Sequence, residues 1–267
     1  MKGRVTRMRL LTRLLLVVAL MALPGAASAA DVRVMISAGF YHVYSELGPA
    51  FERTSGHHLI TTRGPSMGDS PESIPTRLAH GEAADVVILD GGAADKLASA
   101  GLLRADSKVT LARSLIGMVV RAGAARPDIG SVEAFKATLL AAKSIACSDS
   151  GSGTYLSTQL FAKLGIAEEV LPKNRRIRGP PSGEPVAAVV ARGEAEIGFQ
   201  QVSELMNVAG VDYVGTIPAE LQPGFTFAGV LTRSAGNADA ANALLRFLNS
   251  PEADAVKVTA GLMPAGP

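Results

Sequence analysis

Short β-rich runs alternate with helical segments from Val32 onward, and this alternation restricts the possible folds more than any other feature of the sequence. The runs and the helical patterns that follow them occupy residues 32–37 and 41–54, 58–62 and 73–79, and 84–89 and 93–100. Consecutive parallel strands need crossover helices of this kind, which cover the faces of the sheet. The alternation therefore predicts an α/β fold built on a mostly parallel sheet flanked by helices.

The later part of the chain continues the alternation less regularly. Strands are expected at residues 115–121, 144–147, 195–199, 211–216 and 225–232. Helices are expected at residues 131–141, 154–164, 186–192, 238–248 and 251–259. Residues 106–113 are predicted to be a polar connection, and the basic run Arg175, Arg176 and Arg178 to be a solvated face. The length of the chain allows one large domain or two lobes.

The first 29 residues have the features of an export signal. Five basic residues precede an apolar run, Leu14 to Leu23, and Ala27-Ser28-Ala29 fits a cleavage site. The run is short for a bilayer span, although an uncleaved anchor is the alternative. Cleavage takes the formal net charge from +2 to −3, which leaves no basic surplus for nucleic acid. We expect a periplasmic protein without a membrane span after cleavage.

The composition argues against several kinds of site. The only cysteine, Cys147, excludes an internal disulfide and a multi-cysteine metal site. The four histidines lack metal-ligand spacing, so neither a metal nor a cofactor is expected. Cys147 is interpreted as a small buried residue at a strand end, and a nucleophile is the alternative. The chain has no Trp and few other aromatic residues for stacking sugars or bases.

A turn rich in serine and glycine, residues 148–154, joins a predicted strand to a predicted helix. Free backbone N–H groups at the positive end of a helix dipole favour an anion. We therefore predict an anion site here, with Ser150, Ser152, Gly153 and Thr154 as contacts. The alternative is that the two serines only cap the helix.

Three longer segments together resemble the periplasmic solute-binding proteins of type II topology, nearest their molybdate-binding branch. They are residues 81–103 (GEAADVVILDGGAADKLASAGLL), 191–205 (ARGEAEIGFQQVSEL) and 244–262 (LLRFLNSPEADAVKVTAGL). The resemblance implies a two-lobed fold in which the chain crosses twice between lobes. It implies a first lobe of residues 30–112 plus 227–267, a second lobe of residues 113–226, and a ligand in the cleft between them.

The resemblance also implies which residues face the cleft. The first lobe would contribute Ser37, Gly39, Phe40, Ser66, Met67 and Ser70. The second lobe would contribute Gln200, Gln201 and Ser203 in addition to the serine-rich turn, and Arg113 on the crossover would clamp a carboxylate. Each residue also has a plain alternative, as an ordinary loop hydroxyl, an amide satisfied within the protein or a solvated charge.

Two departures from the molybdate-binding pattern favour a larger carboxylate ligand. Those proteins resemble one another in a small-Ser-Ser element after the first strand, where this chain has Ser37-Ala38-Gly39-Phe40. They also tend to have a tyrosine after the strand that corresponds to residues 195–199, where this chain has Gln200-Gln201.

Two functions follow from the resemblance. The first is a monomeric receptor that binds a small anion and delivers it to an ABC permease. The alternative is an enzyme, because IGFQQVSEL (197–205) and VGTIPAELQ (214–222) resemble a branch that contains periplasmic aconitate isomerase. An allylic proton shift would need an acid–base group, for which His42, Glu204 and Asp90 are candidates in that order.

Overall fold

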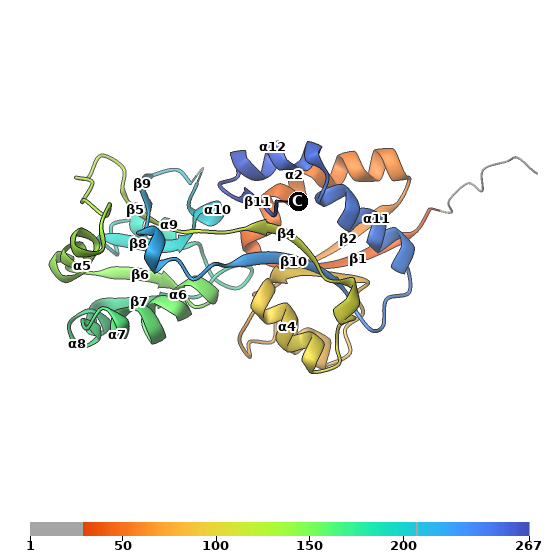
Figure 1. Cartoon of the computed structure of the whole chain (residues 1–267), viewed down its shortest axis with the longest axis horizontal. Helices are drawn as coiled ribbons and strands as arrows, with labels where there is room; N and C mark the ends of the chain where they lie inside the picture. The colour runs from red at the N-terminus through yellow and green to blue at the C-terminus, as the bar shows by residue number, and fades with distance from the viewer. Residues whose placement is uncertain (1–28, 207, 267) are drawn as a thin grey trace, which may run out of the picture.

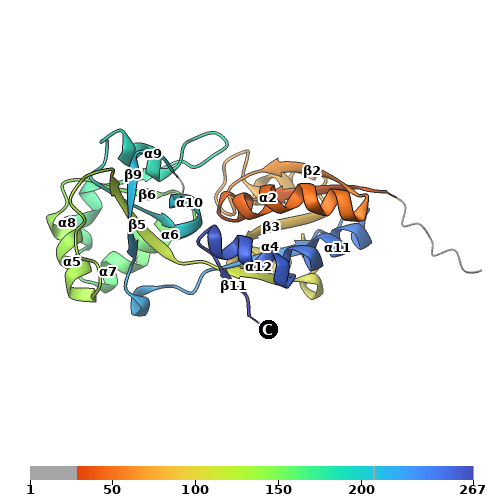
Figure 2. The same ribbon diagram turned by 90° about the horizontal axis from the view of Figure 1, so that it is seen from above.

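The computed structural model describes residues 29–206 and 208–266. Apart from Ala29, the predicted export signal therefore lies outside the described residues. The described chain forms two lobes, each with its own β-sheet covered by helices, and two extended connections cross between them (Figure 1 and, from above, Figure 2). Among the described residues, no helix is long and apolar enough to cross a membrane.

The first lobe contains a six-stranded sheet in the order β11-β4-β10-β3-β1-β2. Its strands are β1 (Asp31–Ile36), β2 (His58–Arg63), β3 (Val86–Asp90), β4 (Val109–Arg113), β10 (Thr226–Leu231) and β11 (Met263–Pro264). The flanking helices are α2 (Ala38–Ser55), α3 (Ile74–Ala79), α4 (Gly91–Ser99), α11 (Ala238–Leu248) and α12 (Pro251–Thr259), with a 3-10 turn η1 (Ala105–Ser107). β1, β2 and β3 are parallel, and β10 runs against both of its neighbours.

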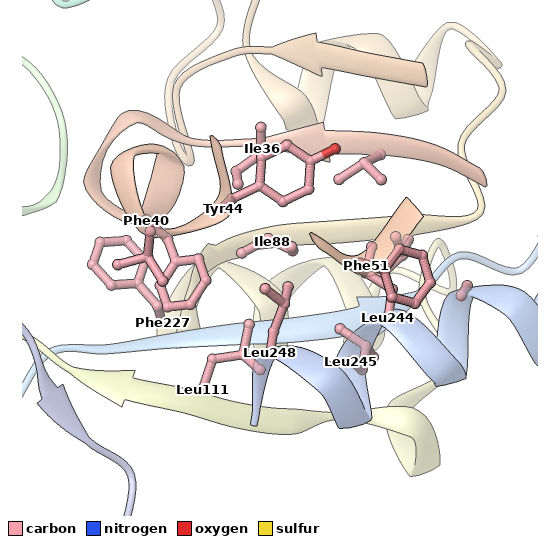
Figure 3. Close-up of a cluster of buried hydrophobic side chains, with 14 of the residues drawn as sticks. Ile36, Phe40, Tyr44, Phe51, Ile88, Leu111, Phe227, Leu244, Leu245 and Leu248 are labelled. Atoms are coloured by element: carbon pink, nitrogen blue, oxygen red, sulfur yellow. The ribbon is translucent and has the colours of Figure 1, made fainter. Parts of the chain in front are cut away.

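One core of this lobe lies between the sheet and α2, α11 and α12. Figure 3 shows the aromatic side chains of Phe40 and Phe227 near one end of the cluster, with leucines of α11 packed along it. A second cluster covers the opposite face, where α3 and α4 pack on β3 and β10. The sheet is therefore buried on both faces, as expected where helices cross over between its parallel strands.

The second lobe contains a five-stranded sheet in the order β7-β6-β8-β5-β9. Its strands are β5 (Ile116–Arg121), β6 (Ile145–Ser148), β7 (Asn174–Ile177), β8 (Ile197–Gln201) and β9 (Val211–Thr216). Its helices are α5 (Val132–Ala141), α6 (Gly151–Tyr155), α7 (Phe161–Lys163), α8 (Ala167–Val170), α9 (Val186–Ala191) and α10 (Val202–Leu205). A π-helical turn η2 (Leu156–Leu160) joins α6 to α7, and η3 (Leu171–Lys173) and η4 (Ala219–Leu221) are 3-10 turns.

The α/β class and the two sheets agree with the prediction, and both sheets are mixed. In each sheet the strand that enters the lobe through a crossover, β10 or β5, runs antiparallel to its neighbours. β4 and β7 were predicted to be a polar connection and a solvated face, and both are strands. β7 is an edge strand with one neighbour, so it buries only Ile177 and leaves Arg175 and Arg176 exposed.

The first helix begins at Ala38, earlier than the predicted Tyr41. Gly39 lies in its first turn, where close packing leaves no room for a side chain, and does not break the chain before the helix. A Cβ atom at this position would lie 2.2 Å from Cζ of Phe227 and 2.6 Å from Oε1 of Gln201. Glycine therefore allows the start of α2 to approach both the first core and the second lobe.

Hydrogen bonds hold the two crossovers together. The Ser114 N–H donates to the Phe225 carbonyl (2.8 Å). Gln222 accepts from the Ile116 N–H (2.9 Å) and donates to the carbonyls of Ile116 (3.0 Å) and Ile217 (3.2 Å). One amide side chain thus fixes the ends of both connections, so the lobes are joined by a hinge with defined geometry.

Gln222→Ala should lower the free energy of unfolding by about 1–2 kcal/mol, because three hydrogen bonds to backbone groups at the hinge are lost. Chemical denaturation measures this change. Gln159→Ala, at an exposed helical position, is the matched control and should have little effect. Equal stability of the two variants would contradict the structural role of Gln222.

Candidate functional site

A partly open cavity lies between the lobes, where the carboxyl ends of strands from both sheets meet. Its walls are Ser37, Ala38, Gly39, Pro65, Ser66, Asp90 and Phe227 from the first lobe and Ser148, Asp149, Ser150, Gly151, Gly179, Pro180, Gln200, Gln201 and Glu204 from the second. About 30 Å³ inside it is open to the centres of water-sized molecules. This space is smaller than a polycarboxylate, so binding one would require the walls to move apart.

The wall of the first lobe carries two serines and a carboxyl group. The Ser66 hydroxyl accepts from the Asp90 N–H (3.0 Å), and Asp90 Oδ1 accepts from the Ala93 N–H (3.0 Å) at the start of α4. Burial raises the pKa of Asp90, and hydrogen bonds from the backbone oppose that shift. Ser37 is 4% exposed, and its hydroxyl has no hydrogen-bond partner among the described residues.

The serine-rich turn forms part of the opposite wall. The hydroxyls of Ser148 and Ser152 are 3.1 Å apart, and the Gly153 N–H donates to Ser148 Oγ (3.3 Å). Ser150 and Gly151 line the cavity directly at the N-terminus of α6. The arrangement directs the positive end of this helix to the cavity, as an anion site requires.

Arg176 stabilises this turn from outside the cavity. Its guanidinium donates to the Ser148 carbonyl (2.9 Å), the Ser157 hydroxyl (2.8 Å) and the Thr154 hydroxyl (2.9 Å). Arg176 is exposed, as predicted. Its three hydrogen bonds also make it a structural part of the turn.

Glu204 faces the cavity from α10 and has the most perturbed carboxyl group there. Burial raises its pKa from 4.5 to about 7. The hydrogen bond from Gln200 and the charge of Arg63 oppose this rise, and the charge of Asp149 adds to it. Gln200 Nε2 donates to Glu204 Oε2 (2.6 Å), while Gln200 Oε1 accepts from the Val186 N–H (3.2 Å). These contacts fix the carboxyl orientation and give it a proton affinity suited to exchange near neutral pH.

The second lobe also contacts the first lobe directly through α10. The Ser203 hydroxyl donates to the Gly39 carbonyl (2.7 Å) across the boundary between the lobes. Next to it, Gln201 is 6% exposed, and its Oε1 has no hydrogen-bond partner among the described residues. The end of β8 and the start of α10 therefore combine cavity-lining groups with a contact that holds the lobes closed.

Of the predicted contacts, the structure brings eight into the cavity wall: Ser37, Gly39, Ser66, Asp90, Ser150, Gln200, Gln201 and Glu204. The others lie outside this wall: His42, Phe40, Met67, Ser70, Arg113, Ser152, Gly153, Thr154 and Ser203. Met67 is close to it, because its Cε lies 3.4 Å from the position of a Cβ on Gly151.

For three of these residues the structure gives a physical reason why the side chain lies outside the cavity wall. Phe40 is fully buried and packs on Phe227 at a ring distance of 6.0 Å. His42 lies on an exposed face of α2, with its Nε2 4.0 Å from Glu46 Oε2. Arg113 ends β4 with an exposed side chain, since the preceding Ala112 fills the core position. His42 as acid–base group and Arg113 as clamp are therefore not supported by this geometry.

Sequence reasoning missed Asp149 in the wall and Arg63 near it. Both lie at the carboxyl end of a parallel strand, β6 or β2, and this position was the available signal. Among the described residues, no group of three or more His, Cys, Asp or Glu side chains could hold a metal ion.

Comparison with known proteins gives a family and two kinds of relative. Residues 32–262 match the model of the bacterial extracellular solute-binding proteins. Aconitate isomerase of Pseudomonas sp. is 45% identical over 231 residues, which cover 86% of this chain and 87% of that protein. Molybdate-binding protein ModA of Azotobacter vinelandii is 29% identical over 256 residues, which cover 92% and 95%.

A solved structure gives the same picture at the level of the fold. The periplasmic molybdate-binding protein of Azotobacter vinelandii has a TM-score of 0.69 with this chain and 20% sequence identity to it. The likeness covers 88% of this chain and 100% of that one.

Proposed function

The chain belongs to the family of bacterial extracellular solute-binding proteins and has their type II two-lobed fold, and from this premise we propose that it is a periplasmic isomerase of the aconitate type. The 45% identity to aconitate isomerase over most of both chains supports this activity. We further propose lobe boundaries at residues 30–112 plus 227–267 and 113–226, and export through the N-terminal signal.

Glu204 is the observation that carries the proposal. A receptor for a multiply charged anion gains no affinity from a carboxylate facing its ligand, because like charges repel. A general base, in contrast, needs a pKa near the working pH, and Glu204 has a pKa of about 7. The contact with Gln200 holds this group in one orientation. A raised pKa inside a cleft is typical of a catalytic group.

The proposed reaction is an allylic proton shift within the substrate. The Glu204 carboxylate removes a proton from the methylene carbon, and the electron pair of that C–H bond forms a new double bond to the central carbon. The electron pair of the old double bond takes up a proton at its far carbon, delivered by the protonated Glu204. One proton leaves and one is added, so the step balances without an oxidant or reductant.

The serine-rich turn would bind a carboxylate of the substrate during this shift. Ser150 and Gly151 at the start of α6 supply N–H groups, and the Ser37 hydroxyl, which has no partner among the described residues, supplies an O–H donor. Fixed donors of this kind stabilise the negative charge that develops as the proton leaves.

A receptor that delivers an anion to an ABC permease is the second candidate. The similarity to a molybdate-binding protein over 92% of the chain favours it. The carboxyl groups of Asp90, Asp149 and Glu204 in the cavity wall repel any anionic ligand, an oxyanion and a tricarboxylate alike, so they do not separate the two candidates.

Incubation of the purified protein with cis-aconitate in D₂O distinguishes the two. The isomerase should form trans-aconitate, which proton NMR measures, and solvent deuterium in the product reports exchange of the Glu204 proton before its return. Absence of turnover, together with a rise in melting temperature on adding molybdate, would instead support the receptor.

A further inference from the structure

Arg63, the last residue of β2, has a guanidinium group without a hydrogen-bond or ion-pair partner among the described residues. Its Nε is buried and has no hydrogen bond within the described part of the chain. Its Cζ lies 4.0 Å from the centre of the Tyr41 ring, and the side chain is half-buried. Leaving a buried N–H donor without an acceptor is unfavourable. A ligand that accepts a hydrogen bond from the stacked guanidinium would therefore lower the free energy of the site.

The position of Arg63 in the sheet brings it to the margin of the cavity. It pairs in register with Ile36, the residue before Ser37, and the Gly64 N–H donates to the Ile36 carbonyl (3.1 Å). Its charge lowers the pKa of Glu204, which comes from the other lobe. Arg63 is therefore on the first lobe, near the group proposed as the base.

Three other cations near the cleft have partners or are exposed. Arg176 donates to three oxygen atoms of the serine-rich turn and its helix. Lys108 binds Asp95 at 2.6 Å, and Arg113 is exposed at the hinge. Arg63 thus combines proximity to the cavity with free donors in the described chain.

We propose that Arg63 is a carboxylate-binding residue, and that it selects a tricarboxylate over a small inorganic oxyanion. The planar guanidinium binds a carboxylate with two parallel hydrogen bonds, and stacking on Tyr41 holds its plane so that one edge stays available. The serine-rich turn receives another carboxylate, so a ligand must span both lobes. This inference rests on the proposed function, because it assigns a substrate group to the same cavity.

Binding of propane-1,2,3-tricarboxylate, an unreactive probe, tests the inference by calorimetry. Arg63→Met should weaken its Kd about 100-fold and Arg63→Lys about 10-fold, since hydrogen bonds to charged groups are lost or fewer. Arg53→Met, at an exposed position of α2, is the matched control and should bind as the wild type does. Tyr41→Phe should keep the affinity and Tyr41→Leu should reduce it.

Two further readouts separate this inference from the proposed activity. If aconitate is isomerised, Arg63→Met should raise KM about 100-fold and move the acidic limb of kcat/KM to higher pH, because a positive charge near Glu204 is removed. An unchanged Kd and KM in Arg63→Met would overturn the inference while the isomerase stands. Arg63-dependent tricarboxylate binding without any turnover would overturn the isomerase and support the inference.

Discussion

Glu204→Gln should leave aconitate bound but reduce kcat for isomerisation by about 10³-fold, because the amide cannot take up the proton that the carboxylate removes. The substitution changes few contacts, since Gln200 can still donate to the oxygen atom of the new amide. Steady-state kinetics and calorimetry measure the two effects separately. A variant with wild-type kcat would show that another group carries the proton.

The pH dependence of the wild type should report the same group. Glu204 acts as a base only when it is ionised, so kcat/KM should rise with pH through a midpoint near its pKa of about 7. Asp149→Asn removes a negative charge that raises this pKa, and the midpoint should therefore move to lower pH. A midpoint that stays fixed in this variant would contradict the assignment.

The direction of the Glu204 pKa shift also determines how this residue makes the stability of the fold depend on pH. The folded protein holds the Glu204 proton more tightly than the unfolded chain does, since the pKa is 4.5 ordinarily and about 7 after folding. Protonation therefore stabilises the fold fully below pH 4.5, and this stabilisation is lost as the pH rises toward 7. Glu204→Gln should remove this contribution from the pH dependence of unfolding.

Gly153→Ala should lower the free energy of unfolding by about 3 kcal/mol and abolish anion binding. A Cβ at this position would lie 1.9 Å from the carbonyl oxygen of Ser148 and 2.8 Å from its carbonyl carbon and its nitrogen. These are backbone atoms at the end of β6, so the turn itself must shift. Because the turn also lines the cavity, binding and stability should fall together.

Gly151→Ala is the matched control for this effect on stability. Its Cβ would meet Met67 Cε at 3.4 Å and Asp90 Oδ2 at 3.9 Å, which are ordinary contacts with side chains. Thermal and chemical denaturation should show Gly151→Ala close to the wild type and Gly153→Ala far below it. Equal stability of both variants would mean that the turn accommodates a methyl group at either position.

The fold could be predicted well where hydrophobic periodicity is strong. The helices at 238–248 and 251–259 and the strand at 211–216 have the predicted boundaries. β4 was missed because polar residues precede it and its burial depends on β10, which comes far later in the chain. β7 was missed because an edge strand with three polar residues lacks an apolar pattern.

The site could be predicted only in part, since strand order and side-chain direction depend on tertiary structure. Ser37, Asp90 and Ser150 lie in the cavity wall as predicted because they follow strand ends, which is a local property. The clamp was assigned to Arg113, whose side chain is exposed, while Arg63 became apparent only through its stacking on Tyr41. A helical pattern could not show which side of α2 is exposed at His42.

The short helix α10 holds both Glu204 and Ser203, the residue that donates to Gly39 across the lobes. Proton transfer and lobe closure therefore depend on the same four residues. In the proposed isomerase, parting of the lobes breaks the bond between Ser203 and Gly39, whereas chemistry needs Glu204 beside the substrate. In a turnover cycle built this way, the opening rate sets an upper limit on kcat, and solvent viscosity should slow the enzyme even where the chemical step is fast.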